Sequence, residues 1–570
     1  MRKTGRKLVA VLAGLVILTL LGPAACRRRA QPSAELQSLL AADTLDRQVG
    51  DAVVRAAVRA FYTQTGTTLA WSPDAPGKPT DKALAVLASA DTHGLDPAAY
   101  QIATLTAERD VLARRPEAER RQAQAVFDVR MTAALIRLGR DVAVGRVRPR
   151  AIDSRWKAQR PMPNLAVTLA AARTDVGGWL PAIQPPHPEY AALLGALAAL
   201  RGAEAKGGWT ALGAATLTPG IRHPRVAVLR KRLAASGDLG TASVDGNRYD
   251  QSLERAVSVF QEHHGLPASG RLDQKTAAAL DVPLATRIQQ VALNLERWRW
   301  LPDDLGARHF RVNIPHFHLE AHEQGRVVLD IRAVVGKAGN ETPVFSERMT
   351  HVVMSPYWNI PTKIATNETL PAMWADPDYL DRQNIEVVRV SGGEAAVVDA
   401  ASLDWDDEDA LKGVRFRQRP GAANALGFVK FMFPNAYDVY VHDTPADALF
   451  GRLGRAFSHG CVRVEEPVEL ANYVLRDQSQ WTPEAIATAM HAGVEKHVKL
   501  REAIPIHILY FTSWVDAKGG LQFRDDVYGY DAKQAAATTS KTRRREDAKP
   551  EPKEAVLSPR PQAGTSATGG

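Results

Sequence analysis

The chain has 570 residues, which is too long for one compact core and predicts two to four domains. Its composition, 45% hydrophobic and 24% charged, is ordinary for a soluble globular protein. The formal net charge of +9 comes from the ends, because residues 1–29 hold seven basic residues and no acid, and residues 531–570 carry a net +3. The remainder has a net charge of −1. A nucleic-acid partner is therefore not expected.

The N-terminus has the pattern of a secretory signal peptide over residues 1–25. Four basic residues precede an apolar run from Leu8 to Leu21, and small residues follow. The run is shorter than the roughly 20 apolar residues of a membrane span, and an uncleaved signal anchor is the alternative. The segment resembles a bacterial lipoprotein signal ending at Cys26, with Pro23 where leucine is usual. We expect export to the periplasm, with membrane attachment only through a signal anchor or a lipid on Cys26.

Residues 36–215 are rich in Ala, Leu and Arg at helical spacing and predict a helical scaffold domain with little visible chemistry. Gly and Pro cluster around residues 206–224 and indicate a boundary. We expect residues 480–530 to complete this scaffold.

A compact three-helix unit is predicted over residues 221–283. Asp250 and Asp273 are suited to start its second and third helices, and Gly265 to end the second. Its sequences AVSVFQEHHGL and ASGRLDQKT resemble the peptidoglycan-binding module. Glycan binding is implied by that resemblance alone, and an ordinary three-helix bundle without a ligand is the alternative.

From Arg308 the pattern changes to short alternating strands, which predict a β-rich domain, closed or sandwiched. A polar interruption over about 362–415 predicts an inserted subdomain or lid. Residues 531–570, rich in Ala, Thr, Lys, Arg and Pro, predict a disordered tail.

The stretch AFSHGCVRVEEP holds Cys461, one of only two cysteines. In an exported chain whose other cysteine lies in the signal region, Cys461 is a free thiol. A thiol is a weak nucleophile until a nearby base or positive field ionises it. His442 ends the strand VYVH, where alternation places it on the same face as Tyr440. His459 lies on the loop of the thiol itself and is less firmly oriented, and the helix start near Pro467 is too distant for its dipole to matter.

His442, a fifteen-residue spacer and then SHGCVR resemble the motif of the L,D-transpeptidase catalytic domain, also called the YkuD-type domain. The resemblance covers about residues 306–475, including SPYWNIP and FPNAYDVYVHDTP. With the scaffold and the module, the whole chain resembles the large periplasmic L,D-transpeptidases. The implied fold is multidomain α+β: a helical scaffold, a three-helix peptidoglycan-binding-like module and a β-sandwich-like catalytic domain with an inserted lid.

The resemblance also assigns roles to individual residues. It makes Cys461 the nucleophile and His442 the general base, oriented by the backbone carbonyl of Asp443. The other matching positions shape the pocket and the oxyanion site, or line the cleft: Ser458, His459, Gly460, Arg463, Tyr440, and with a weaker match Trp358 and Asn359.

The implied activity is a two-step acyl transfer that cross-links two third-position stem residues of peptidoglycan, with no metal or cofactor. Two alternatives stay open. The same acyl-enzyme could pass its acyl group to water, as an L,D-carboxypeptidase, or to a protein lysine; or the chain could be a non-catalytic wall-binding scaffold. The expected partners are stem peptides and glycan, with glycan synthases or D,D-carboxypeptidases as further candidates.

The histidines of PHFHLEAH raise a metal-binding alternative. His316 and His318 share one strand face, but His322 breaks the alternation, and no Cys or acidic partner has zinc-site spacing. Surface or cleft histidines are the favoured interpretation. His263 and His264, at a helix end, need no ligand.

Overall fold

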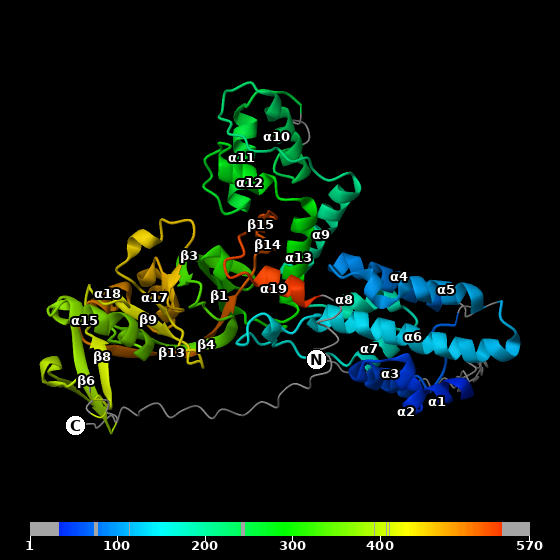
Figure 1. Ribbon diagram of the computed structural model, residues 1–570, viewed down its shortest axis with the longest axis horizontal. Helices are drawn as coiled ribbons and strands as arrows, with labels where there is room; N and C mark the ends of the chain where they lie inside the picture. The colour runs from blue at the N-terminus through cyan, green and yellow to red at the C-terminus, as the bar shows by residue number, and fades with distance from the viewer. Residues whose placement is uncertain are drawn as a thin grey trace, which may run out of the picture.

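The computed structural model describes residues 33–72, 78–112, 114–240, 245–392, 394–405, 407, 409 and 411–538. The expected signal segment and Cys26 lie outside these residues. Figure 1 shows the helical scaffold, the small helical module, the β-rich domain and, at the far end of that domain, the inserted subdomain. The multidomain α+β fold is thus confirmed. In the described part of the chain, no helix is both long and apolar enough to cross a membrane.

The scaffold is built around one long helix, α6, whose buried side chains share a core with the shorter helices around it. Helix α3 starts where the sequence provides a cap, since the Asp51 carboxylate accepts hydrogen bonds from the N–H groups of Val53 and Val54. The helices are α1 (Ala34–Leu40), α2 (Ala42–Gln48), α3 (Ala52–Gln64), α4 (Pro79–Ala88), α5 (Ile102–Leu112), α6 (Glu117–Val144), α7 (Leu165–Ala172), α8 (Trp179–Ile183) and α9 (Pro188–Ala205).

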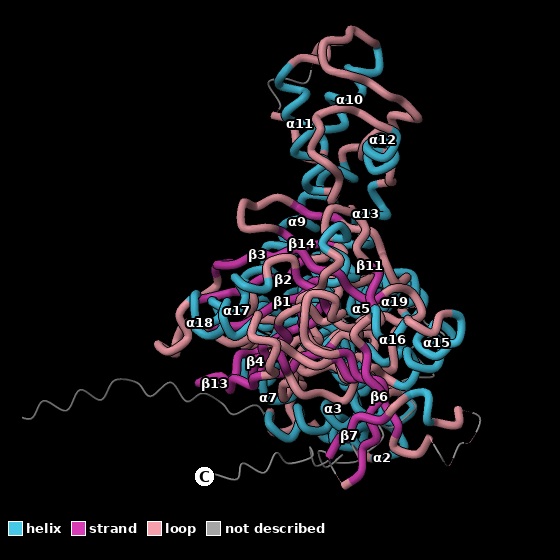
Figure 2. The backbone as a smooth tube through the Cα atoms, turned by 90° about the vertical axis from the view of Figure 1, so that its left-hand side faces the viewer, coloured by secondary structure: helices cyan, strands magenta, loops and turns pink. Residues whose placement is uncertain are grey.

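The module projects from the rest of the molecule (Figure 2). The predicted caps are confirmed: Asp250 accepts from the N–H of the third residue after it and Asp273 does the same, while Gly265 has a positive φ of 65°. The ring of His264 stacks on Phe523 of the C-terminal segment at 5.4 Å, which fixes the module at its base. The helices are α10 (Pro224–Ala235), α11 (Gln251–His263), α12 (Gln274–Leu280) and, leading out of the module, α13 (Leu284–Trp298).

A buried ion pair at the end of α13 joins this helix to the scaffold. The Glu296 carboxylate accepts hydrogen bonds from the backbone N–H groups of Arg146 and Val147, and from the guanidinium of Arg299 at 2.9 Å. Arg299 also donates to the carbonyl oxygen of His93 in the scaffold at 2.5 Å. Because both charges are buried, removing either would leave the other poorly compensated.

Nine strands form one sheet in the order β11-β3-β12-β10-β9-β4-β13-β1-β2, and β2 also pairs with β3. This last pairing closes the sheet around an apolar core. The predicted β-rich domain is confirmed, and of the two expected arrangements it has the closed one and not the sandwich. Strands β1 and β13, β10 and β12, and β11 and β3 pair in parallel. The elements are β1 (Arg308–Asn313), β2 (His318–Glu323), β3 (Arg326–Gly336), β4 (Phe345–Met354), β9 (Val429–Met432), β10 (Val441–His442), β11 (Ala456–Ser458), β12 (Val462–Val464), α17 (Pro467–Leu475), α18 (Pro483–Met490) and β13 (Lys496–Leu509).

The insertion is a folded subdomain with its own small apolar core, which includes Ile385, Val387 and Phe416. Its antiparallel sheet has the order β5-β8-β6-β7. It therefore begins and ends slightly outside the expected 362–415. The elements are β5 (Trp358–Asn359), α14 (Thr362–Ile364), the π-helix η7 (Ala365–Thr369), α15 (Leu370–Ala375), α16 (Tyr379–Arg382), β6 (Ile385–Ser391), β7 (Glu394–Val398) and β8 (Val414–Gln418).

Two expectations for the C-terminal region need correction. Residues 480–530 do not simply complete the scaffold, because β13 lies inside the closed sheet between β4 and β1. Only the part around β14 (Ser513–Val515) and β15 (Leu521–Phe523) packs against α9 and α13. The tail prediction is wrong for residues 531–538, since α19 (Tyr530–Ala537) buries a side chain at each turn. The remainder of 531–570 lies outside the described residues.

Replacing Glu296 by alanine tests the buried ion pair. We expect Glu296→Ala to lower the free energy of unfolding by about 3–5 kcal/mol, because Arg299 would be left as a buried charge without its carboxylate. Chemical denaturation measures this loss. The matched control is Glu204→Ala, on the exposed side of α9. Equal losses in the two variants would contradict the interpretation.

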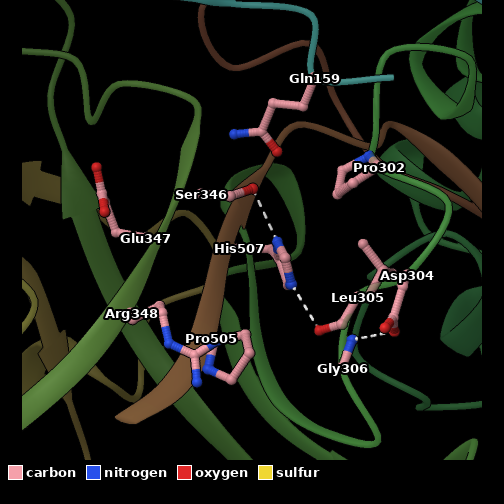
Figure 3. A pocket seen from close by; sticks show the side chains of 10 residues that line it. All are labelled: Gln159, Pro302, Asp304, Leu305, Gly306, Ser346, Glu347, Arg348, Pro505 and His507. Carbon is pink, nitrogen blue, oxygen red and sulfur yellow. Dashed lines mark hydrogen bonds between the residues drawn. The ribbon is translucent and has the colours of Figure 1, made fainter. Parts of the chain in front are cut away.

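Two histidines of the closed sheet are buried as neutral rings. Burial is the main cause that lowers the pKa of His309 to about 3 and that of His507 to about 4. His507 lines a cavity of about 320 Å³ between the scaffold and the sheet. Its ring nitrogens lie 2.7 Å from Ser346 Oγ and 3.0 Å from the carbonyl oxygen of Leu305, and Figure 3 shows both contacts as dashed lines. Both ring nitrogens thus have partners in the folded protein.

These two histidines predict a loss of stability in mild acid. Below about pH 6.5 the unfolded chain binds protons at both positions, whereas the folded chain does so only near pH 4 and pH 3. The melting temperature should therefore fall as the pH is lowered from about 6.5 to 4, and His309→Gln should reduce that slope. His497→Gln, at a side chain that is 60% exposed, is the control. A slope unchanged by His309→Gln would contradict this account.

Candidate active site

The residues expected to be catalytic are brought together by the parallel pairing of β10 with β12. Val441 pairs with Val462, and His442 with Arg463. The two valines are fully buried in the core, so alternation turns His442 and Arg463 to the opposite face. Tyr440 directly precedes Val441 and Cys461 directly precedes Val462, so both lie on the same face as His442. The ring of Tyr440 lies 5.6 Å from that of His442. One register thus gathers the nucleophile, base, arginine and tyrosine of the sequence analysis.

His442 is held as a neutral imidazole. Its Nδ1 lies 2.5 Å from the carbonyl oxygen of Asp443, the contact that the resemblance implies. Burial, and next the cation of Arg463, lower the pKa of His442 to about 3. Because Nδ1–H donates to Asp443, Nε2 is left with its lone pair and can accept a proton.

Cys461 is a protonated thiol in the resting protein. Burial raises its pKa to about 11, and hydrogen bonds from Tyr440 and the charge of Arg463 offset this only in part. Its Sγ lies 3.8 Å from the carbonyl oxygen of Asp438. The sequence suggested a thiolate activated by histidine, whereas the raised pKa of Cys461 and the lowered pKa of His442 favour a neutral thiol and a neutral imidazole. Any nucleophilic attack must therefore move the proton during the step itself.

A serine hydroxyl closes the loop that carries the thiol. Ser458 Oγ donates to the carbonyl oxygen of Cys461 at 2.5 Å and accepts from the N–H of Gly460 at 3.1 Å. Gly460 has a φ of +122°, which a residue with a side chain rarely adopts. Its carbonyl oxygen accepts from Thr342 Oγ1 at 2.8 Å. Ser458 and Gly460 are thus structural parts of the loop, and the Gly460 N–H is already engaged.

His459 points away from the thiol, toward the insertion. Its Nε2 lies 2.8 Å from the carboxylate of Glu368 in η7. A second contact joins Lys363 Nζ of α14 to Asn340 Oδ1 at 3.0 Å. Trp358, at the root of the insertion, hydrogen-bonds the side chain of Tyr440. The inserted subdomain therefore lies against the loop of the candidate nucleophile, and Trp358 joins the site while Asn359 is exposed.

The sequence analysis missed Lys430. It pairs with His442 across β9 and β10 and so lies on the same face, opposite to Arg463. Its Nζ lies 3.5 Å from the carbonyl oxygen of Tyr357 and 3.9 Å from Glu495, and burial lowers its pKa. Two partly buried cations thus flank the imidazole. The sequence did contain a signal for it, since Lys430 lies inside the otherwise apolar strand VKFM.

The histidines of the metal-binding alternative have other partners. His316 stacks on His318 at 4.1 Å, His318 pairs with Asp330, and His322 pairs with Glu320. Within the described ranges no group of three or more His, Cys, Asp or Glu side chains is placed to hold a metal ion.

Three segments match models of known families. Residues 307–489 match the L,D-transpeptidase catalytic domain, residues 222–280 a "Putative peptidoglycan binding domain" and residues 56–197 a scaffold domain. The Haemophilus influenzae protein named "Putative L,D-transpeptidase" is 36% identical over 243 residues, 43% of this chain and 48% of that protein. The β-rich domain is an L,D-transpeptidase catalytic domain. The chain spans about half the length of the curated relative it matches.

Solved L,D-transpeptidases also show likeness to this chain. One from Xylanimonas cellulosilytica is 17% identical, covering 51% of this chain and 97% of its own, with a TM-score of 0.17. One from Stackebrandtia nassauensis is 14% identical, covering 51% and 94%, with a TM-score of 0.22. Scores this low carry no argument about the fold, which rests on the sheet described above.

Replacing Gly427 tests whether its close packing against Asp443 stabilises the candidate active site. A Cβ there would overlap the carboxylate of Asp443, which accepts from the N–H groups of Phe428 and Thr444 at 2.7 and 2.6 Å. Gly427 also has a φ of +60°. We expect Gly427→Ala to lower the free energy of unfolding by about 1–3 kcal/mol, measured by denaturation. Gly454→Ala, where a Cβ meets open space, is the control; a neutral Gly427→Ala would contradict the interpretation.

Proposed function

We propose that the protein is a cysteine-dependent L,D-transpeptidase of the periplasm that forms 3-3 cross-links through a thioester on tetrapeptide stems. The observation that carries the proposal is the β10–β12 register, which gathers Cys461, His442 and Arg463 on one face. The match of residues 307–489 to the catalytic domain supports the same chemistry.

In the first step, the Cys461 sulfur attacks the carbonyl carbon of the third stem residue while His442 Nε2 takes the thiol proton. The contact between Nδ1 and the carbonyl oxygen of Asp443 stabilises the imidazolium that forms. The C–S bond replaces the carbonyl π bond, giving a tetrahedral oxyanion. The N–H of Cys461 is the proposed donor to it, since no acceptor for this group occurs among the described residues.

The intermediate collapses when the C–N bond to the terminal D-alanine breaks and His442 gives its proton to the leaving amine. In the second step, the side-chain amine of another stem attacks the thioester. Its proton passes to His442 and then to the departing sulfur, which restores the neutral pair. Splitting one amide exchange into two acyl transfers lowers each barrier.

The donor must be a tetrapeptide, so a D,D-carboxypeptidase acting before this enzyme is a proposed partner, as is a glycan synthase that supplies strands. Glycan binding by the module is proposed from its family match. Water or a protein lysine as acceptor would use the same acyl-enzyme. Analysis of muropeptide products distinguishes these acceptors, because only the transpeptidase yields 3-3 dimers.

Intact-mass spectrometry with a carbapenem tests the nucleophile. We expect one covalent adduct on the wild type and none on Cys461→Ala. His442→Gln should slow acylation by about 100-fold or more, because the thiol then lacks its base. His223→Gln, in the module, is the matched control. A wild type that forms no adduct would contradict the proposal and favour a non-catalytic wall-binding scaffold.

A further inference from the structure

One short segment of the scaffold reaches into the catalytic domain. Ile152 and Trp156 are buried in the same core as the strands of the closed sheet, and Trp156 packs edge-on against Trp300 at 5.0 Å. The two residues flank a turn that holds Asp153 and Arg155. The scaffold is therefore anchored beside the site through residues 152–156, in addition to the contacts of α13.

The side chain of Arg155 is held by a carboxylate of its own segment. It donates to both carboxylate oxygens of Asp153, at 3.0 and 2.6 Å. The same carboxylate accepts from the hydroxyl of Tyr530 in α19 at 2.5 Å. A two-pronged, charge-assisted contact of this kind sets the direction of the guanidinium as well as its position.

Arg155 then contacts two separate loops of the catalytic domain. Its Nη1 donates to the carbonyl oxygen of Glu341 at 3.2 Å. Its own carbonyl oxygen accepts from the hydroxyl of Tyr437 at 2.8 Å. Side chain and backbone of one scaffold residue thus bridge the loop after β3 and the loop before β10.

In each of these loops, the residue that follows the one in contact with Arg155 contacts the loop of the candidate nucleophile. Thr342, next to Glu341, donates to the carbonyl oxygen of Gly460 at 2.8 Å. Asp438, next to Tyr437, offers its carbonyl oxygen to Cys461 Sγ at 3.8 Å and has a φ of +53°, which is uncommon for a residue with a side chain.

The first of these loops is itself rigid. The hydroxyl of Tyr528 donates to the carbonyl oxygen of Gly336 at 2.6 Å and accepts from the N–H of Thr342. A Cβ at Gly336 would overlap the backbone of Asn340, so the loop is packed on itself. Because the loop is rigid, a displacement of the Arg155 side chain would also displace Gly460.

We propose that Arg155 and Tyr437 are positioning residues for the transpeptidase reaction, through which the scaffold domain holds the Cys461 loop against His442. The inference rests on the proposed function, since it gives the scaffold a part in that chemistry. Neither residue touches the reacting atoms. Their effect is the alignment of a thiol whose proton must pass to the imidazole during attack.

Two substitutions in the full chain test this role. Tyr437→Phe removes one hydroxyl and keeps the ring that packs on Phe345 at 5.1 Å. Arg155→Lys keeps a cation and loses the two-pronged contact with Asp153. The matched control is Tyr62→Phe, which removes a buried hydroxyl bonded to Asp128 at 2.6 Å within the scaffold.

Two reactions of Cys461 are followed by mass spectrometry: acylation by a carbapenem, and alkylation by iodoacetamide as a function of pH. We expect Tyr437→Phe to slow acylation about fivefold, the effect of one hydrogen bond, and Arg155→Lys at least as much. The alkylation midpoint should move to lower pH in both, because a loosened loop admits water to the thiol. Tyr62→Phe should lower the melting temperature and leave both reactions unchanged.

The outcomes separate this inference from the proposed function. Folded Tyr437→Phe and Arg155→Lys with wild-type acylation and a wild-type alkylation midpoint would overturn the inference alone. A wild type that is alkylated but never acylated would overturn the proposed function, and the midpoints would still decide the positioning role. Should Arg155→Lys fail to fold, Tyr437→Phe decides by itself.

Discussion

The site depends on one constraint, the parallel register between the two short strands β10 and β12. Because Val441 and Val462 must both face the apolar core, His442 and Arg463 are forced to the opposite face together with Tyr440 and Cys461. A slip by one residue would turn the histidine side into the apolar core and the valines away from it. Core packing thus fixes the relative position of the proposed nucleophile and the proposed base without any direct bond between them.

The same burial sets the electrostatics. Lys430 and Arg463 flank His442, and with burial they keep the imidazole neutral, while burial keeps the thiol of Cys461 protonated. A neutral pair avoids an isolated thiolate in the periplasm, the oxidising compartment that we propose for the protein. It also makes alignment decisive, because the proton is transferred only when sulfur, imidazole and substrate are placed together. The proposed role of Arg155 and Tyr437 is to maintain that alignment.

Local sequence patterns predicted the local features. Alternation in VYVH placed His442 and Tyr440 on one face, and the acidic caps at Asp250 and Asp273 marked helix starts. The features that were missed depend on contacts between distant segments. The place of Lys430 follows from the pairing of β9 with β10, and that of β13 from closure of the sheet. Short-range composition suggested disorder where α19 packs against α13, since the alanines of α19 and the basic residues that follow it in the sequence mask its buried stripe.

The most direct measurement of the central claim is the identification of the acyl-enzyme on Cys461. The chain would be mixed with a tetrapeptide stem whose third-residue side-chain amine is blocked, so that no acceptor amine is present, and digested at low pH for tandem mass spectrometry. The account predicts a thioester that adds to Cys461 the mass of the tetrapeptide minus that of one D-alanine. No such addition is expected in Cys461→Ala. Release of D-alanine with the wild-type thiol unmodified throughout, or equally by Cys461→Ala, would contradict it.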